Sequence, residues 1–299
     1  METVQLGISP LQVGAIAYGC WRFAESSVSD ATVKINTALD AGMTLIDTAD
    51  IYGLGESTGF GGAEAVLGNV LKQDKSLREQ MVLATKGGID AIRPYDNSYD
   101  YLMTAIDKSL SRLSVATIDL YQIHRPDITT PMTEIARFLD DIIQAGKARY
   151  VGVSNFTPSQ TRALQAHLKN SLITTQPEFS AIEQAPIVDG TLDLSMEHRM
   201  TTLAWSPLAG GELATGKSKD ATDIFMRVIK CLDRLAETYT VERSLIALAF
   251  TMGHGADVIP IIGTQNIDRI KQSAQAADIP LTGRDFYDIV EAYRGESMP

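Results

Sequence analysis

The sequence predicts a (β/α)8 barrel with extra C-terminal helices, in which residues 1–299 form a single α/β domain. The first observation is that short apolar runs alternate with amphipathic stretches, which is typical of parallel βαβ units. The second is the number of runs, because eight parallel strands are what such a barrel needs. The third is that polar residues repeatedly stand where a run ends, and barrel enzymes place their chemistry at those ends.

The apolar runs are short and rich in β-branched residues, as expected of strands that are buried on both faces. An amphipathic stretch with helical spacing separates most runs from the next, so strands and helices alternate along the chain. We expect the eight strands at residues 15–19, 44–48, 81–86, 117–124, 150–154, 172–176, 202–206 and 258–263.

Helix start and stop signals bound the amphipathic stretches. The helix at 30–42 should place Val33, Ile35, Ala38 and Leu39 near one buried face and should end at a glycine. The helix at 98–113 starts at a serine and the helix at 158–169 at a proline, residues that favour the first turn of a helix, and the other helices follow from their spacing. We expect them at 63–71, 98–113, 133–146, 158–169, 222–239, 241–252, 266–277 and 283–293.

A doubly wound sheet is the alternative that the same alternation allows. Such sheets usually carry a GxGxxG turn after the first strand, whereas the first run here ends in the sequence YGCW at 18–21. The glycine cluster at 59–62 leads into the helix at 63–71, so a flexible loop and helix start explains it better than a dinucleotide fingerprint. We therefore favour the barrel.

Composition narrows the function classes. The formal net charge of −11 argues against a nucleic-acid partner and against an anionic membrane surface, because both attract basic proteins. No run approaches the ~20 apolar residues of a membrane span, and the N-terminus does not resemble a signal peptide, so we expect a cytoplasmic monomer or small homo-oligomer. Cys20 and Cys231 are too few for a disulfide framework and lack metal-site spacing.

Ionisable residues at the ends of consecutive strands define a candidate site. Asp47 lies near the end of the second expected strand, Lys86 ends the third and His124 ends the fourth, while Tyr52 follows just beyond the second. The carboxyl ends of barrel strands share one face, so these side chains should lie together. Each residue alone is more often structural than catalytic, and it is the joint placement that favours chemistry.

These four residue types suit the reduction of a carbonyl group, which needs a hydride on carbon and a proton on oxygen. A phenol such as Tyr52 can donate the proton, but its ordinary pKa of about 10 is high for that task. An ammonium such as Lys86 favours the phenolate and should bring that pKa down. A carboxylate such as Asp47 keeps the ammonium charged and in place, and a neutral imidazole such as His124 can hydrogen-bond the substrate oxygen.

The segment 42–53, GMTLIDTADIYG, resembles the GxxxxDTAxxYG signature of the aldo-keto reductases. Six further blocks follow in that family's order and extend the resemblance over essentially the whole chain: LATK at 83–86, YQIHRPD at 121–127, GVSNF at 152–156, QPE at 176–178, WSPLAGG at 205–211 and IPIIGT at 259–264. The resemblance implies a barrel oxidoreductase that interconverts carbonyl compounds and alcohols with a nicotinamide cofactor and no metal. It also implies that Asp47, Tyr52, Lys86 and His124 form the catalytic tetrad, with Tyr52 as the general acid.

The same resemblance implies which residues hold the nicotinamide. Ser154, Asn155 and Gln176 match positions that bind the carboxamide. Trp205 matches an aromatic residue that stacks on the nicotinamide ring, and a core aromatic is the alternative interpretation. The positions that match the loop over the pyrophosphate are Ser206, Leu208 and Gly210.

The adenosine end departs from the family pattern GT[KR]xxxRxxEN. Gly263, Thr264 and Arg269 keep their places, but Gln265 replaces the cation and Gln-Ser replaces Glu-Asn at 272–273. Arg269 could pair with a 2′-phosphate or stack on adenine, whereas a neutral amide supplies no charge. We expect NADP(H) to be preferred over NAD(H).

Candidate substrate residues lie on loops. Trp21 follows the first strand and matches a position that often lines the pocket in the family, while Arg93 and Tyr95 lie in the loop at 88–98. The substrate should be a small carbonyl compound or alcohol.

Two other functions compete with this reading. The first is a cofactor-sensing regulatory or binding subunit with little turnover, because some relatives act in that way. The second is a metal-dependent barrel hydrolase, which the histidine spacing disfavours, since none forms an HxH or HxxxH pair.

Overall fold

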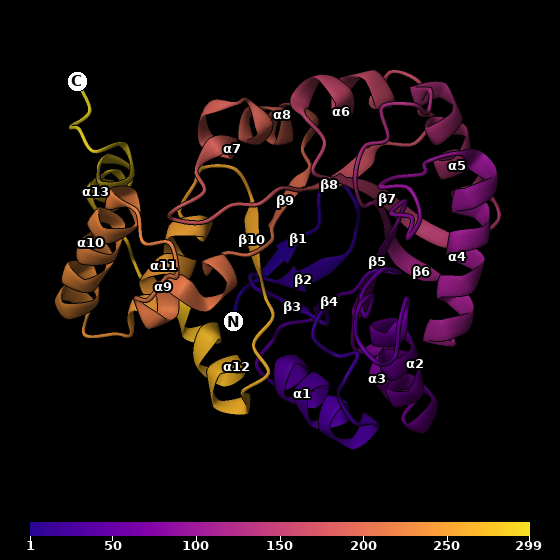
Figure 1. Cartoon of the computed structure of the whole chain (residues 1–299), viewed down its shortest axis with the longest axis horizontal. Helices are drawn as coiled ribbons and strands as arrows, with labels where there is room; N and C mark the ends of the chain where they lie inside the picture. Colours follow the sequence, from indigo (N-terminus) through magenta and orange to yellow (C-terminus); the bar gives the residue numbers. More distant parts are fainter.

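Eight parallel strands close into a barrel in the computed structural model, which describes residues 1–299 (Figure 1). In chain order they are β3 (Ala17–Gly19), β4 (Leu45–Asp47), β5 (Val82–Gly87), β6 (Ile118–Ile123), β7 (Ala148–Ser154), β8 (Leu172–Gln176), β9 (Thr201–Ala204) and β10 (Val258–Ile262). Each strand pairs with the next, and β10 pairs with both β9 and β3, which closes the sheet. The eight predicted strands and the barrel are thereby confirmed.

A ring of helices surrounds the barrel (Figure 1). The helices that connect one strand to the next include α1 (Val28–Asp40), α2 (Gly62–Gln73), α4 (Tyr99–Leu113), α5 (Met132–Gln144), α6 (Pro158–Gln165) and α11 (Arg243–Met252). The extra C-terminal elements are α10 (Asp223–Tyr239), which packs against α13 (Gly283–Arg294), and α12 (Ile267–Ser273), which continues into η2 (Ala274–Asp278). Short helices that the pattern did not predict are α3 (Ser76–Glu79), α7 (Ala185–Val188), α8 (Thr191–His198), η1 (Ala209–Gly211) and α9 (Glu212–Thr215).

Helix α1 buries a face that differs from the predicted one. Ile35 and Ala38 are buried as expected, but Val33 is 51% exposed and Lys34 is buried in its place. The reason is a partner that lies far away in the sequence: Lys34 Nζ donates to Gln265 Oε1 at 2.9 Å, in the loop that follows β10. An amine whose hydrogen bonds are made can be buried where an apolar side chain was expected, because the bonds offset the cost of removing it from water.

A short antiparallel hairpin closes the N-terminal end of the barrel. Its strands, β1 (Thr3–Gln5) and β2 (Gln12–Gly14), were not predicted. Leu6 and Val13 are fully buried in the apolar cluster that fills the lower barrel interior. Gly7 is required at the contact, because a Cβ there would lie 2.4 Å from a carbonyl oxygen of β8.

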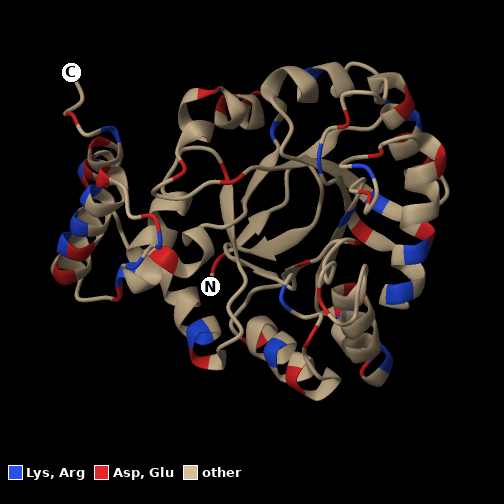
Figure 2. Ribbon diagram, in the orientation of Figure 1, with Lys and Arg blue, Asp and Glu red and all other residues tan.

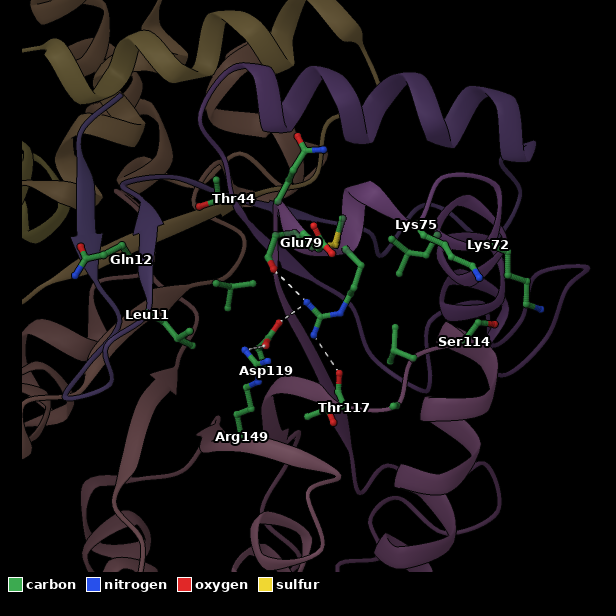
Figure 3. A pocket seen from close by; sticks show the side chains of 17 residues that line it. Leu11, Gln12, Thr44, Lys72, Lys75, Glu79, Ser114, Thr117, Asp119 and Arg149 are labelled. Carbon is green, nitrogen blue, oxygen red and sulfur yellow. Dashed lines mark hydrogen bonds and ion pairs between the residues drawn. The ribbon is translucent and has the colours of Figure 1, made fainter.

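A cavity of about 780 Å³ also lies at this N-terminal end, away from the predicted site (Figure 3). Asp119, only 2% exposed, accepts hydrogen bonds or ion pairs from Arg78 at 2.8 Å, Arg149 at 3.2 Å and the Leu83 amide at 2.9 Å. Arg78 also donates to the Thr117 carbonyl oxygen. The network ties the starts of neighbouring strands together, which is a stabilising role typical of this end of a barrel.

Charged residues of both signs are interspersed along the outer helices, whereas the barrel strands carry few (Figure 2). None of the helices is both long enough and apolar enough to cross a bilayer. Both cysteines are free and buried.

Candidate active site

A buried lysine amine is the centre of the predicted site. Lys86 Nζ donates to Asp47 Oδ2 at 2.6 Å, to the Thr48 carbonyl oxygen at 2.8 Å and to Tyr52 Oη at 3.1 Å. Lys86 is 0% exposed and Asp47 is 3% exposed. Three acceptors satisfy the three N–H donors of the ammonium, so its charge is fully compensated despite the burial.

The barrel register brings these groups together. Asp47 ends β4 and Lys86 lies one residue before the end of β5, and β4 and β5 are neighbours. The chain then turns back over β5, where the Asp50 amide donates to the Lys86 carbonyl oxygen at 3.0 Å. Tyr52 is fixed from the other side, because its carbonyl oxygen accepts the Ala63 amide at 3.1 Å at the start of α2. The phenol is therefore aimed at the amine by backbone contacts on both sides.

His124 completes the arrangement. Its ring meets the Tyr52 ring edge to face, with centroids 5.9 Å apart, and its amide donates to the Gly87 carbonyl oxygen at 2.9 Å. His124 Nδ1 is buried and has no hydrogen-bond partner. Burial, helped by Lys86 and Arg125, holds the pKa of the imidazole well below its usual value. A neutral imidazole can donate a hydrogen bond to a carbonyl oxygen.

The electrostatics of Tyr52 differ from the expectation in one respect. Burial raises the pKa of Tyr52 above its usual value, and the opposing effect of Lys86 does not outweigh it. Burial likewise acts to lower the pKa of Lys86, but Asp47 and Tyr52 overcome it and the pKa is raised. The phenol is thus held in its protonated, donor form beside a permanent cation.

The residues predicted to hold the carboxamide lie side by side at the ends of β7 and β8. Ser154 Oγ donates to the Gln176 carbonyl oxygen at 2.8 Å, and Asn155 Nδ2 donates to Ser154 Oγ at 2.8 Å. Gln176 Nε2 donates to Asp47 Oδ1 at 3.1 Å, so this group is joined to the tetrad. Trp205 Nε1 donates to Asn155 Oδ1 at 3.0 Å, and the indole is half-buried rather than enclosed in the core.

The predicted pyrophosphate loop has an unusual backbone. Ser206, Ala209 and Gly210 all have left-handed conformations, with φ of 54°, 47° and 67°. Ser206 Oγ accepts the Gly210 amide at 3.1 Å, which fixes the turn, and Leu208 is half-buried behind it. A Cβ on Gly210 would meet no atom within 4 Å, so this backbone faces open space.

Asn155 is the other left-handed residue of the site, with φ of 60°. Left-handed backbone costs about 1–2 kcal/mol for a residue with a side chain. Such strain concentrates at functional positions, where the surrounding contacts enforce it.

The adenosine end lies where β10 leads into α12. Arg269 is exposed and forms no ion pair, while Thr264 is half-buried. Gln265 is turned toward α1, where Lys34 holds its amide oxygen. Lys34 itself pairs with Asp30. Gln265, which stands where the family pattern has a cation, thus lies next to the Lys34 ammonium, but Lys34 already has Asp30 as a carboxylate partner.

The predicted substrate residues fall in two places. Trp21 is 48% exposed and lies against Gly263, because a Cβ on that glycine would be 2.7 Å from Trp21 Nε1. Tyr95 is 39% exposed. Arg93 turns onto its own loop and pairs with Asp96. None of these three is part of the hydrogen-bonded network around Lys86, and their role stays a prediction.

Two residues of interest escaped the sequence analysis. Arg125 directly follows His124, and its guanidinium lies over the Trp205 ring; its place after a strand-end histidine was the signal that could have found it. Asp50 is fully buried, and neither carboxylate oxygen has a hydrogen-bond partner. No three histidine, cysteine or acidic side chains converge in a way that could hold a metal ion.

Comparisons with known proteins identify the family of the chain and agree with its barrel fold. The model of the family described as "Aldo/keto reductase family" matches residues 15–294. A 6-dehydroglucose reductase of Novosphingobium aromaticivorans is 47% identical over 99% of this chain and 96% of its own length. A protein of the same name from Agrobacterium fabrum is 32% identical over 96% of this chain and 97% of its own length. The crystal structure of a thermostable aldo-keto reductase with the inhibitor epalrestat matches 98% of this chain and all of that chain, with a TM-score of 0.84 and 23% identity.

Proposed function

Because the chain belongs to the aldo/keto reductase family, we propose that it reduces an aldehyde or ketone to an alcohol with Tyr52 as the proton donor. Family membership makes it an oxidoreductase of carbonyl and alcohol groups that uses NAD(P). The observation that carries the finer proposal is the Lys86 amine, which lies within hydrogen-bond distance of both Asp47 and the Tyr52 hydroxyl.

The described residues fit a nicotinamide cofactor. A carboxamide needs one donor and one acceptor, and the Ser154, Asn155 and Gln176 side chains present hydroxyl and amide groups at one edge of the barrel. The half-buried Trp205 offers a flat ring beside them, and the open backbone at Gly210 suits the approach of phosphate oxygens. Bound there, the reduced cofactor would supply the hydride.

The protein side chains would supply the proton. Tyr52 Oη donates it to the carbonyl oxygen, and the Lys86 ammonium 3.1 Å away stabilises the phenolate that remains. Asp47 keeps the ammonium charged and in place. His124 donates a hydrogen bond that orients the same oxygen, and its low pKa keeps it neutral so that it does not compete as an acid.

We propose NADP(H) as the preferred cofactor. The exposed Arg269 guanidinium is free to meet a 2′-phosphate, as no acidic side chain pairs with it. Gln265 adds no charge, because its amide is neutral, and Lys34 holds the amide oxygen on the α1 side.

We further propose that the substrate is an oxidised sugar. The 47%-identical protein of N. aromaticivorans is named for the reduction of 6-dehydroglucose, an aldehyde that carries several hydroxyl groups. The identity extends over 99% of this chain, so the loops above the barrel are included in the comparison.

Parallel assays of NADPH and NADH oxidation test the proposal, with 6-dehydroglucose and a panel of simple aldehydes. Tyr52→Phe should lower kcat about 10²–10⁴-fold, the usual worth of a general acid. Tyr239→Phe is the matched control, because it also removes a tyrosine hydroxyl that is hydrogen-bonded to a charged side chain, here Asp285, and it lies on the outer helix α10. If neither cofactor is oxidised with any aldehyde although both bind, the chain is a cofactor sensor rather than a reductase.

A further inference from the structure

An arginine without a partner lies beside the catalytic histidine. Arg125 is half-buried and directly follows His124 at the end of β6. No acceptor lies within hydrogen-bond distance of its guanidinium, and no carboxylate lies within ion-pair distance. In a chain with a net charge of −11, most arginines find an acidic neighbour, as Arg78, Arg112 and Arg149 do. A cation without such a neighbour at the mouth of a site is available to a ligand.

The backbone that carries Arg125 is rigid. Asn97 Nδ2 donates to the Arg125 carbonyl oxygen at 2.9 Å, and the Asn97 amide donates to Asp127 Oδ2 at 3.2 Å. The loop at 88–98 is thereby tied to the segment after β6. The guanidinium is presented from a fixed base, which lowers the entropy that a ligand contact would cost.

The guanidinium also lies on the same polar surface as the other predicted site residues. Its central carbon is 5.7 Å from the centre of the Trp205 ring. Trp205 is hydrogen-bonded to Asn155, and Asn155 Nδ2 donates to the His124 carbonyl oxygen at 3.1 Å. One continuous set of contacts therefore connects the unpaired cation to the indole and, through Asn155, to the backbone of His124.

A carboxylate comes from a residue that, like this cation, adjoins Trp205. Glu178 is half-buried and forms a backbone bridge with Trp205. Burial and the neighbouring Glu183 raise the pKa of Glu178, while Arg125 acts against that shift, so the two charges interact. They are nevertheless more than 4 Å apart, since no ion pair forms. A donor and an acceptor that both adjoin Trp205, with no ion pair between them, are available to a ligand that bonds to both.

We propose that Arg125 and Glu178 recognise hydroxyl groups of the substrate, so that the enzyme selects hydroxylated aldehydes over apolar ones. This inference rests on the proposed function. Guanidinium is a donor only and carboxylate is an acceptor only, and an alcohol can satisfy both at once. A substrate without hydroxyl groups would leave both charges desolvated and unpaired, and sites built on hydrogen bonds reject such analogues strongly.

The test compares three small aldehydes that differ in polarity: glyceraldehyde, propanal and succinic semialdehyde. Wild type should prefer glyceraldehyde to propanal. Arg125→Met should lower kcat/KM for glyceraldehyde about 10–100-fold, the worth of a hydrogen bond to a charged group, and should change the value for propanal less than about 3-fold. Arg125→Lys should retain part of the preference, and Glu178→Gln should weaken it without loss of the propanal activity.

Arg137→Met on α5 is the matched control, because that guanidinium also lies over an aromatic ring, 4.1 Å from the centre of Tyr99, on the outside of the barrel. The ratio of the two kcat/KM values should not change in this variant. If Arg125→Met lowers kcat/KM equally for glyceraldehyde and propanal, Arg125 has only a structural role and the inference is overturned. A preference for succinic semialdehyde that depends on Arg125 would overturn it in favour of an anion site.

The failure of the proposed function gives a different pattern. In that case wild type oxidises neither cofactor with any of the three aldehydes. If wild type reduces all three equally well and Tyr52→Phe does not, the proposed function stands and only the role of Arg125 and Glu178 falls.

Discussion

Replacing Lys86 with methionine removes the amine that joins the candidate site and keeps most of the side-chain volume. The amine makes three hydrogen bonds, to Asp47 at 2.6 Å, to Thr48 at 2.8 Å and to Tyr52 at 3.1 Å. After the change, the Asp47 carboxylate keeps only the Gln176 amide at 3.1 Å as a side-chain partner. The substitution therefore leaves a charge that is 3% exposed and uncompensated.

The magnitude follows from that burial. Breaking a buried ion pair by removing one partner costs about 3–5 kcal/mol of unfolding free energy. If Asp47 is also changed to asparagine, no buried charge remains, and the amide can still accept from Gln176. The Asp47→Asn/Lys86→Met double variant should then be more stable than Lys86→Met alone by about 1–3 kcal/mol, the cost of leaving a charged group unsatisfied.

Urea unfolding followed by the fluorescence of Trp21 and Trp205 measures these free energies. All variants should lose activity, so they are compared by their unfolding free energies and not by their turnover. If the double variant is less stable than Lys86→Met by a further 3 kcal/mol or so, the two side chains contribute independently, and the reasoning from a coupled buried pair is wrong.

Four further predictions concern buried or paired polar groups. Burial lowers the pKa of His124 well below the unfolded value of about 6.5. The rate of carbonyl reduction should therefore show no inflection near that pH. An inflection there that disappears in His124→Gln would contradict this prediction. The same shift means that unfolding takes up a proton below pH ~6.5, so stability should fall as the pH drops through that value, and His124→Gln should flatten the fall. Burial raises the pKa of Asp50 well above its usual value, so its contribution to stability is lost as the pH rises above ~3.9. Asp50→Asn should therefore gain about 1–3 kcal/mol at pH 8 and little at pH 4, and an equal gain at both pH values in thermal unfolding would refute this. Gln265→Arg should tighten NADPH about 10-fold relative to NADH, because Lys34 would repel the new guanidinium toward the cofactor; an equal change in both dissociation constants, measured by fluorescence quenching, would exclude that effect.

The barrel and the arrangement of the tetrad were predictable because their signals are local. Each apolar run has the length and composition of a buried strand, and parallel strands bring their ends to one face. Asp47, Lys86 and His124 therefore had to meet once the barrel was assigned. In the structure these side chains lie together, and the short turn after β4 brings Tyr52 to them.

The features that escaped prediction depend on partners far away in the sequence. The three-residue strands of the N-terminal hairpin carry too little pattern, and their packing against β8 is a tertiary contact. Lys34 looked like a surface residue because its partner Gln265 is 231 residues away. The direction of the Tyr52 pKa depends on burial, which competes with the charge of Lys86 and cannot be weighed from the sequence.

The left-handed backbone at Asn155, Ser206 and Ala209 has a consequence for directed evolution. Glycine would relieve the strain at each of the three, so a library selected only for heat resistance should drift toward glycine there. The Asn155 side chain orients Trp205, and the Ser206 hydroxyl fixes the Gly210 turn, whereas no side-chain hydrogen bond is lost at Ala209. A library selected for turnover should therefore keep the first two and release only the third, which makes Ala209 the position where thermostability can be raised without a conflict with function.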